Sequence, residues 1–500
     1  MADRFRGTPL AVSVRGRRIR GQAFVLLAGV LLLCYASVLV TPYAFLDDYF
    51  ILAEGIRGEG GTRTQVIASG RPTYAFLLHL AFHAMRDIGD LRYLRLLGVL
   101  GIALLAWSFY RTLVFAGWDE YLSLLLSVFV VTMPPFQVYA SWATTAFYPF
   151  AALAAGGAVH VAERAFSEPR PLLRWGLVGG AVLLMLIALT IHQSAAMFFW
   201  VFAAILLFKP DATLPDTVRR LLWYSGIVFA GLILGFGMYK LGTTLYEHAL
   251  LPTRSHLIQD VWGKALWFFR SPLMNAFNLA KLSPKRWLAL VVVFFIIGGL
   301  IQYFRGKAGE RLWQIGIAAA LLPLSYLPNL MIAENWSSYR TQSALTSVVV
   351  MYAFLALWGY SRILRRPTAT LFLTVMLGFA ALGSSLLAAY NVDAYFARPQ
   401  LLELNFMRGQ LTRQDLTQAS SIYIIGAKWQ DSIAPAVRYD EFGFPSSAAS
   451  WVPRPAVYLL LRELSPERSS LPLELAPVDG PVSPPPTALI VDMRKLSSLR

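Results

Sequence analysis

Residues 22–50 read QAFVLLAGVLLLCYASVLVTPYAFLDDYF, an apolar run that ends in an adjacent pair of carboxylates. The apolar part, residues 22–41, is long enough to cross the hydrocarbon core of a bilayer, about 30 Å thick, as a helix. Basic residues favour the cytoplasmic side, and the run is preceded by Arg4, Arg6, Arg15, Arg17, Arg18 and Arg20. We therefore expect residues 1–21 to form a cytoplasmic N-terminus and residues 22–41 a retained signal-anchor, because no small-residue cleavage site follows.

The overall composition indicates a polytopic membrane protein. Of the 500 residues, 57% are hydrophobic and 14% are charged, whereas soluble domains carry about 25% charged residues. The net charge of +16 does not indicate a nucleic-acid partner, because basic residues of a membrane protein can gather on one membrane face. The single cysteine, Cys34, excludes a disulfide or a Cys-based zinc site within the chain.

Ten further apolar runs follow the first, at 93–113, 120–138, 143–162, 175–192, 194–208, 221–241, 287–304, 312–332, 342–361 and 369–390. The sequence thus predicts an all-α polytopic fold with about eleven transmembrane helices. Alternate loops then fall in the cytoplasm. The loop near Arg111 fits the positive-inside rule less well, because Asp119 and Glu120 follow it. The other four loops are basic, as the rule requires. Their basic residues are Arg164, Arg170, Arg174, Lys209, Arg219, Arg220, Arg305, Lys307, Arg311, Arg362, Arg365 and Arg366. This pattern depends on dividing residues 175–208 into two spans.

An odd number of crossings places the C-terminus outside the cytoplasm, after a transmembrane domain at residues 22–390. Residues 391–500 are more polar and contain Pro-rich stretches. They predict a small extracytoplasmic α/β domain with strands at 421–426 and 488–492, while residues 457–464 fit either a strand or a helix.

Two outer loops, residues 42–92 and 242–286, are longer than simple turns. The apolar stretch 73–85 in the first loop is too short to span the membrane and predicts a helix at the outer interface, in contact with membrane lipids. The second loop predicts another such helix from its aromatic residues Trp262, Trp267, Phe268 and Phe269.

The adjacent carboxylates Asp47 and Asp48 come directly after the first span. One interpretation is structural: Asp47 caps a helix that begins at Asp48, and both acids favour the positive end of that helix. The other interpretation is functional, with one carboxylate acting as a general base or a metal ligand where lipid headgroups and extracytoplasmic hydroxyls meet. Adjacent helix positions diverge by about 100°, so the pair can serve both purposes.

Cationic residues recur in the outer segments. Arg71 stands before Pro72, which would begin the interfacial helix. It could bind phosphate, neutralise Asp47 or Glu59, or touch lipid headgroups. Arg340, next to Tyr339 in a late outer turn, could bind phosphate or sugar, or it could form an ion pair with Glu334 or Asp48. For Lys281, on the outer side of a span, phosphate binding and headgroup anchoring are both open.

Several catalytic motifs are missing from the sequence. It contains no H-E-x-x-H, no G-x-S-x-G and no P-loop, so the zinc peptidase, hydrolase and ATPase classes lose their main support. His192, at an outer helix end, fits a structural role better than a catalytic one.

Together these features resemble the polyprenol-phosphate-dependent glycosyltransferases of the GT-C fold. The resemblance rests on Asp47-Asp48 after the first span, Ser69-Gly70-Arg71-Pro72, and Ser338-Tyr339-Arg340. The Asp-Asp pair followed by Gly-Arg-Pro looks most like the membrane glucosyltransferases that modify O-antigen, a part of lipopolysaccharide, and related surface polysaccharides. The outer tail at 391–500 departs from the simplest members of that group.

The resemblance implies an enzyme of the bacterial inner membrane. It would move a hexose such as glucose from a polyprenyl-phosphate donor to a cell-envelope polysaccharide or a lipid-linked glycan. Asp47 or Asp48 would be the base of an inverting single displacement, and the substrate-binding residues would be Arg71, Lys281, Glu334, Tyr339 and Arg340. No cofactor is required, and a divalent cation, Mg or Mn, is left open. Nucleotide sugars are cytoplasmic while these residues are expected outside, which independently favours a lipid-carried donor.

Other functions are open as well. A transporter or flippase of lipid-linked saccharide should carry ionisable residues at mid-span, whereas most acids here lie in loops, although spans are interrupted by Pro134, Pro135, Pro323 and Pro328. A polysaccharide polymerase or ligase would depend on outer-loop Arg and His residues. The last alternative is a non-catalytic scaffold whose tail binds other envelope proteins.

Overall fold

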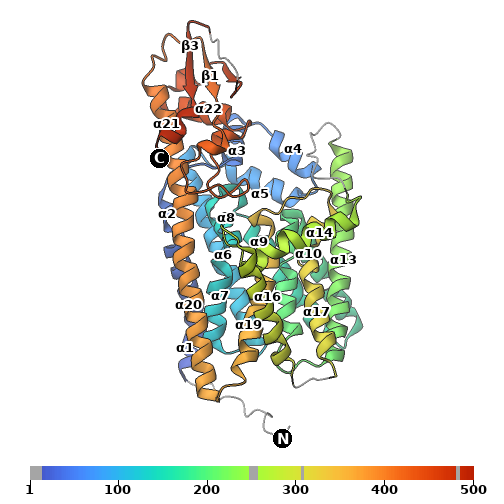
Figure 1. Ribbon diagram of the computed structural model, residues 1–500. Coiled ribbons are helices and arrows are strands. Elements are labelled where there is room, and N and C mark those ends of the chain that lie inside the picture. Colours follow the sequence, from blue (N-terminus) through green and yellow to red (C-terminus); the bar gives the residue numbers. More distant parts are fainter. Residues whose placement is uncertain (1–13, 247–256, 306–308, 480–484, 500) are drawn as a thin grey trace.

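A computed structural model describes residues 14–246, 257–305, 309–479 and 485–499 (Figure 1). Most of the expected cytoplasmic N-terminus, residues 1–13, lies outside the described residues. Part of the second outer loop, residues 247–256, does so too, as do Lys307 of one basic loop and Pro481 and Pro484 of the Pro-rich tail.

Seven helices in the described part of the chain are long and apolar enough to cross a membrane. They contain α6 (Leu91–Phe115), α9 (Tyr148–Ser167), α10 (Pro171–Ile191), α13 (Leu214–Leu245), α16 (Arg286–Tyr303), α19 (Ser343–Ser361) and α20 (Arg366–Val392). An eighth candidate is the pair α7 (Glu120–Val131) and α8 (Pro134–Ser141), which is bent by 64°. Two consecutive prolines open α8 and explain the bend, since proline cannot continue a preceding helix.

Three shorter apolar helices occupy the other expected spans. They are Gln22–Cys34 of α1 (Val14–Cys34), the stretch Gln193–Leu207 that holds α11 (Gln193–Ala196) and α12 (Phe199–Leu207), and α17 (Arg311–Leu324). Every segment that the sequence predicts to span the membrane is therefore helical. The count of eleven crossings stays a prediction.

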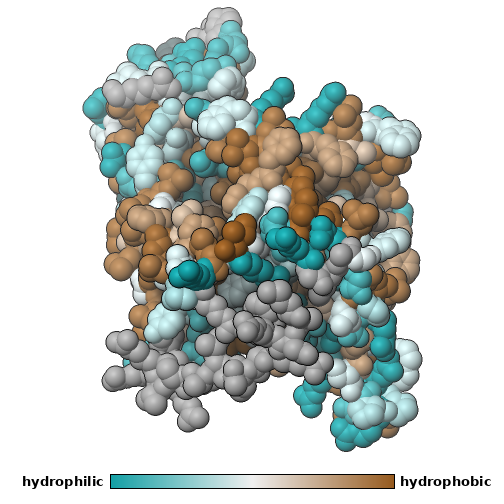
Figure 2. Space-filling view, turned by 60° about the horizontal axis from the view of Figure 1, so that its bottom comes forward, coloured by the Kyte–Doolittle hydropathy of each residue, from teal (hydrophilic) through white to brown (hydrophobic). Residues whose placement is uncertain are grey.

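The outer ring of helices presents apolar side chains to the surroundings. Only 22% of the most apolar window of α10 and of α13 is buried, against 83% for α19 at the centre. Hydrophobic side chains cover broad areas of the visible face in Figure 2. Apolar helices of this length with exposed faces belong in lipid, so the chain is an integral membrane protein.

Helices α16 and α19 cross at small residues. A side-chain carbon on Gly299 would overlap Ala356, and one on Gly359 would overlap the carbonyl oxygen of Gly299. Close backbone approach at small residues is a common way for helices to associate in lipid, where the hydrophobic effect contributes little.

The segment between α1 and α6 contains α2 (Ala36–Val40), α3 (Asp47–Arg57), α4 (Gly61–Ala68) and α5 (Pro72–His83). The short apolar helix predicted at 73–85 is α5, and the aromatic helix predicted in the second loop is α14 (Val261–Arg270). Both helices are confirmed, while their position at the membrane interface stays a prediction.

The C-terminal segment begins as a continuation of α20. A π-helical turn at Asp393–Ala397 joins α20 to α21 (Arg398–Thr412), so that one apolar helix runs over Pro367–Thr412. A parallel sheet follows, in the order β2 (Leu473–Ala476), β1 (Ser421–Ile425), β3 (Ala488–Asp492), with Ile422 paired to both Leu473 and Leu489. The two predicted strands are confirmed, and the ambiguous stretch 457–464 belongs to a helix, α22 (Pro453–Leu464).

The crossing of α16 and α19 yields a stability prediction. Gly359→Ala should lower the stability of the folded protein by about 1–3 kcal/mol, the usual cost of overpacking. Thermal unfolding in detergent measures this effect. Gly378→Ala in α20 is the matched control, since nothing lies within 4 Å of its added carbon. Equal melting temperatures for the two variants would contradict this packing.

Candidate functional site

The Asp47-Asp48 pair lies at a sharp turn that opens α3. Leu46 has φ +46°, in the left-handed region, and α3 begins at Asp47. The expected capping of the helix by Asp47 is wrong. It is Asp48 that binds the preceding turn, because its Oδ2 accepts a hydrogen bond from the Phe45 backbone N–H at 3.1 Å.

Asp48 is fully buried, and both carboxylate oxygens accept hydrogen bonds. Its Oδ1 accepts from the Thr144 N–H at 2.8 Å and from the Thr144 hydroxyl at 2.6 Å. Burial raises the pKa of Asp48 to about 6, although these hydrogen bonds and the charge of Arg95 act against the rise. Asp48 therefore fastens the turn to the core of the protein.

Asp47 is half-buried and points to the C-terminal domain. Its Oδ1 accepts a hydrogen bond from the indole N–H of Trp451 at 3.0 Å. One residue earlier, the Leu46 N–H donates to the Ser446 hydroxyl at 3.0 Å. Two successive residues of the turn are thus held by a segment about 400 positions later, which the sequence analysis missed because no local pattern marks Ser446 or Trp451.

Arg71 precedes α5, as predicted. Its Nε donates to the Ser69 hydroxyl at 3.1 Å, and its guanidinium lies 5.6 Å from the ring centre of Tyr74. The Tyr74 hydroxyl donates to the Thr144 carbonyl. Burial raises the pKa of Tyr74, and the charges of both Arg71 and Asp47 act on its hydroxyl. Tyr74 therefore connects the region of Arg71 to that of the Asp pair.

Arg71 also lines a cavity of about 660 Å³. The cavity contains a second cation, Lys240 of α13, and a set of polar side chains, Ser69, Gln193, Ser194 and Asn329. Its other walls are apolar residues of α10, α13 and the region of α18 (Leu327–Met331), among them Leu189, Leu232, Phe236 and Met331. The cavity is therefore amphipathic, with two cations beside the surfaces of membrane-spanning helices. Asp47, Asp48 and Arg340 do not line it.

Arg340 lies in η5 (Tyr339–Thr341) and binds two acids of the C-terminal domain. Its guanidinium donates to both oxygens of Asp440, at 3.0 and 2.8 Å, and to Glu441 at 3.2 Å. The ion-pair partners suggested by the sequence, Glu334 and Asp48, are wrong. The adjacent acids at 440–441 could have suggested a partner for a buried cation, but nothing in the sequence places them near position 340.

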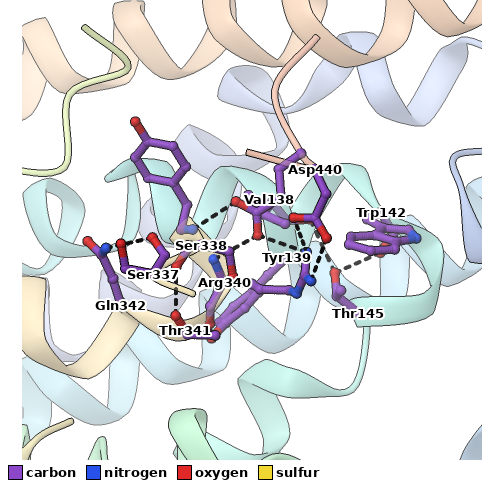
Figure 3. Close-up of polar contacts among 12 residues, drawn as sticks. Val138, Tyr139, Trp142, Thr145, Ser337, Ser338, Arg340, Thr341, Gln342 and Asp440 are labelled. Atoms are coloured by element: carbon purple, nitrogen blue, oxygen red, sulfur yellow. Dashed lines mark hydrogen bonds and ion pairs between the residues drawn. The ribbon is translucent and has the colours of Figure 1, made fainter. Parts of the chain in front are cut away.

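The surroundings of Arg340 are crowded (Figure 3). The guanidinium lies 5.0 Å from the ring centre of Trp142, and the Tyr139 hydroxyl donates to the Arg340 carbonyl. Glu441 is fully buried and accepts from the backbone N–H groups of Tyr339 and Arg340, at 2.8 and 3.0 Å. Burial raises the pKa of Glu441, against the charge of Arg340. Arg340 thus anchors the C-terminal domain to the N-terminal end of α19.

Of the remaining predicted site residues, Tyr339 takes part through its hydroxyl, and Lys281 and Glu334 through their main-chain carbonyls. The Tyr339 hydroxyl donates to the carbonyl of Lys281, whose side chain is exposed. The carbonyl of Glu334 accepts from the Lys264 ammonium at 2.7 Å. His192 is buried, stacks on Tyr148 at 3.7 Å and accepts from a backbone N–H, which fits its expected structural role.

Possible metal ligands are scattered. In the described ranges, no three His, Cys, Asp or Glu side chains are grouped so that they could hold a metal ion.

Two crystal structures of the Archaeoglobus fulgidus oligosaccharyltransferase are similar to this chain. The apo form shares 10% identity and a TM-score of 0.44, covering 82% of this chain and 63% of that one. The complex with Zn and sulfate shares 11% identity and a TM-score of 0.43, covering 92% of this chain and 62% of that one. The chain thus spans less than two thirds of that enzyme's length, and the likeness is too distant to assign a fold or an activity. No protein-family model and no curated protein sequence matches.

The buried Asp48 makes stability depend on pH. Because its pKa is raised from 3.8 to about 6 in the folded protein, the folded protein keeps a proton that the unfolded chain has released in this window. The contribution of Asp48 to stability is therefore present below pH 3.8 and is lost as the pH rises through about 6. The melting temperature should fall over this range, and Asp48→Asn should flatten the fall. If the melting temperature of Asp48→Asn depended on pH as steeply as that of wild type, Asp48 would not be the group responsible.

The Arg340 cluster predicts a non-additive pair of substitutions. Arg340→Met leaves Glu441 buried without its cation, which should cost about 3–5 kcal/mol. The added substitution Glu441→Gln should recover part of this loss, because it removes the uncompensated charge. Limited proteolysis and thermal unfolding of the two single variants and the double variant measure the coupling. Strictly additive effects would mean that the two side chains do not interact.

Proposed function

We propose that this protein is a membrane glycosyltransferase with a GT-C-like fold that takes a sugar, a hexose, from a polyprenyl-phosphate donor. The acceptor is a surface polysaccharide such as O-antigen, or a lipid-linked glycan, on the outer face of the bacterial inner membrane. The single observation that carries the proposal is the amphipathic cavity in which Arg71 and Lys240 lie beside apolar surfaces of spanning helices.

The cavity suits a lipid-linked phosphate in both size and lining. Small-molecule sites typically measure about 300–1,000 Å³, and this one measures about 660 Å³. A polyprenyl phosphate has an anionic head and an apolar tail. Arg71 and Lys240 can bind the head, while Leu232 and Phe236 of α13 offer the tail an apolar wall.

Asp47 is the better candidate for the base. Both oxygens of Asp48 are occupied by the backbone at 45 and by Thr144. Asp47 is half-buried, and the indole of Trp451 fixes the direction of its carboxylate. A base must reach the acceptor hydroxyl before its pKa matters, and only Asp47 of the pair is partly exposed.

The reaction is a single displacement with inversion. The acceptor hydroxyl attacks the anomeric carbon and gives its proton to Asp47, while the bond from that carbon to the phosphate oxygen breaks. Polyprenyl phosphate leaves with an additional negative charge, which Arg71 and Lys240 stabilise. Proton abstraction by a positioned base contributes about 10²- to 10⁴-fold. No second, protonated carboxylate is needed, unlike in a glycosidase, because phosphate is already a good leaving group.

One observation favours a second function, a transporter or flippase of lipid-linked saccharide. The bend of 64° between α7 and α8 makes a broken helix, and transporters often bind their substrates at broken helices. None of the residues that line the amphipathic cavity comes from α7 or α8, so the observation that carries the enzyme proposal lies elsewhere than the bend.

The test compares surface glycans by mass spectrometry in cells that lack the protein and in cells restored with wild type, Asp47→Asn or Glu59→Gln. Glu59 is a matched control, since it is an exposed acid of the same outer segment, paired with Arg57. One sugar should be missing in the null, and its transfer should fall about 100-fold or more with Asp47→Asn. Glu59→Gln should behave as wild type.

The same experiment can overturn the proposal. An intact glycan in the null would exclude the transferase function. A glycan shortened throughout in the null but restored by Asp47→Asn, with normal protein levels, would favour transport or polymerisation instead.

A further inference from the structure

Trp451 is a large aromatic side chain at the surface, next to the candidate base. Its side chain is 52% exposed, although its N–H is bound to Asp47. The neighbouring residues Val452 and Pro453 are buried, so the exposure of Trp451 is local and not a sign of a loosely packed segment.

The segment that carries Trp451 is held rigidly. The buried carboxylate of Glu403, on α21, accepts from the backbone N–H groups of Ser446 and Ser447 at 2.9 and 2.7 Å. The Ser446 hydroxyl in turn accepts from Leu46 and donates to Gln400 at 2.6 Å. The indole is thus fixed at one edge by Asp47 and through its backbone by the anchored segment, so that ligand binding would cost little side-chain entropy.

A fixed, exposed indole next to polar groups suits a saccharide. A sugar ring has an apolar face of C–H groups that can lie against an aromatic ring, and hydroxyls at its edge that seek hydrogen bonds. Exposed Ser450 and Arg454 flank Trp451 in the sequence and offer such partners. Neither Asp47 nor Trp451 lines the proposed donor cavity, which leaves this surface to the acceptor.

We propose that Trp451 stacks on a sugar ring of the acceptor glycan and presents the hydroxyl of that glycan to Asp47. This inference rests on the proposed function and deepens it, because it names a binding site for the acceptor on the C-terminal domain. The indole then has two tasks: its face binds the sugar, and its N–H orients the base.

The two tasks can be separated by substitution. Trp451→Phe keeps an aromatic face but loses the N–H, whereas Trp451→Leu loses both. Trp429 is the matched control, because it is a similarly exposed tryptophan of the same domain, 57% exposed. The probe is the oligosaccharide released from the envelope polysaccharide of cells that lack the protein, titrated onto the full-length protein in nanodiscs by saturation-transfer NMR.

Trp451→Leu should weaken binding of the oligosaccharide about fivefold to tenfold, as expected for one lost aromatic contact. Trp451→Phe should bind within about twofold of wild type yet transfer the sugar more slowly in cells. Trp429→Leu should match wild type in both assays. Asp47→Asn should bind the oligosaccharide and fail to transfer.

Several results would overturn this inference while leaving the proposed function intact. In each case the glycan still changes in cells that lack the protein. One such result is that Trp451→Leu binds the oligosaccharide as wild type does. Another is that Trp429→Leu weakens binding as much as Trp451→Leu does. A third such result is that Trp451→Leu only lowers the amount of protein inserted in the membrane, as expected for a headgroup anchor. An unchanged glycan in the null would instead show that the proposed function itself has failed.

Discussion

The buried guanidinium of Arg95 is the interaction on which the candidate site depends. It lies on α6 and donates to three main-chain carbonyls where the first helical segment ends, those of Val38, Thr41 and Tyr43. Carbonyls at a helix end lack partners within the helix, and a buried cation needs acceptors, so each satisfies the other. The turn that begins at Tyr43 is thereby fixed, and with it the left-handed Leu46 and the direction in which Asp47 leaves the core.

Contacts from the far end of the chain complete this turn. Three of the contacts that join the C-terminal domain to the helical body lie at the candidate site: Ser446 on Leu46, Trp451 on Asp47, and the acids 440–441 on Arg340. Each uses charge or a hydrogen bond between segments far apart in the sequence. A domain held in this way is part of the candidate site and not a separate module on a linker, because its side chains orient the groups that would perform the chemistry.

The sequence predicts what depends on local pattern and misses what depends on distant pairing. Length and hydropathy are enough to find the helices, and α5 and β1 follow from their short apolar runs. The strand β2, Leu-Glu-Leu-Ala, is too short to stand out, and it exists because its backbone pairs with β1. The sequence offers Glu334 or Asp48 as possible ion-pair partners of Arg340, yet the acids that hold it come from 100 positions later. The different roles of Asp47 and Asp48 likewise depend on Thr144 and Trp451.

The long helix over Pro367–Thr412 fixes how far the C-terminal sheet lies from the apolar part of the same helix. At 1.5 Å per residue, its 46 residues extend for about 69 Å, more than twice the hydrocarbon thickness of about 30 Å. The distance of the sheet from the apolar part of this helix is therefore set by helix length. The direction that the sheet faces is set by helical phase, since successive residues are rotated by about 100° about the helix axis. The π-helical turn at Asp393–Ala397 adjusts that phase between the spanning part and the outer part. The helix that contains the last candidate span thus also determines which face of the C-terminal domain meets Asp47.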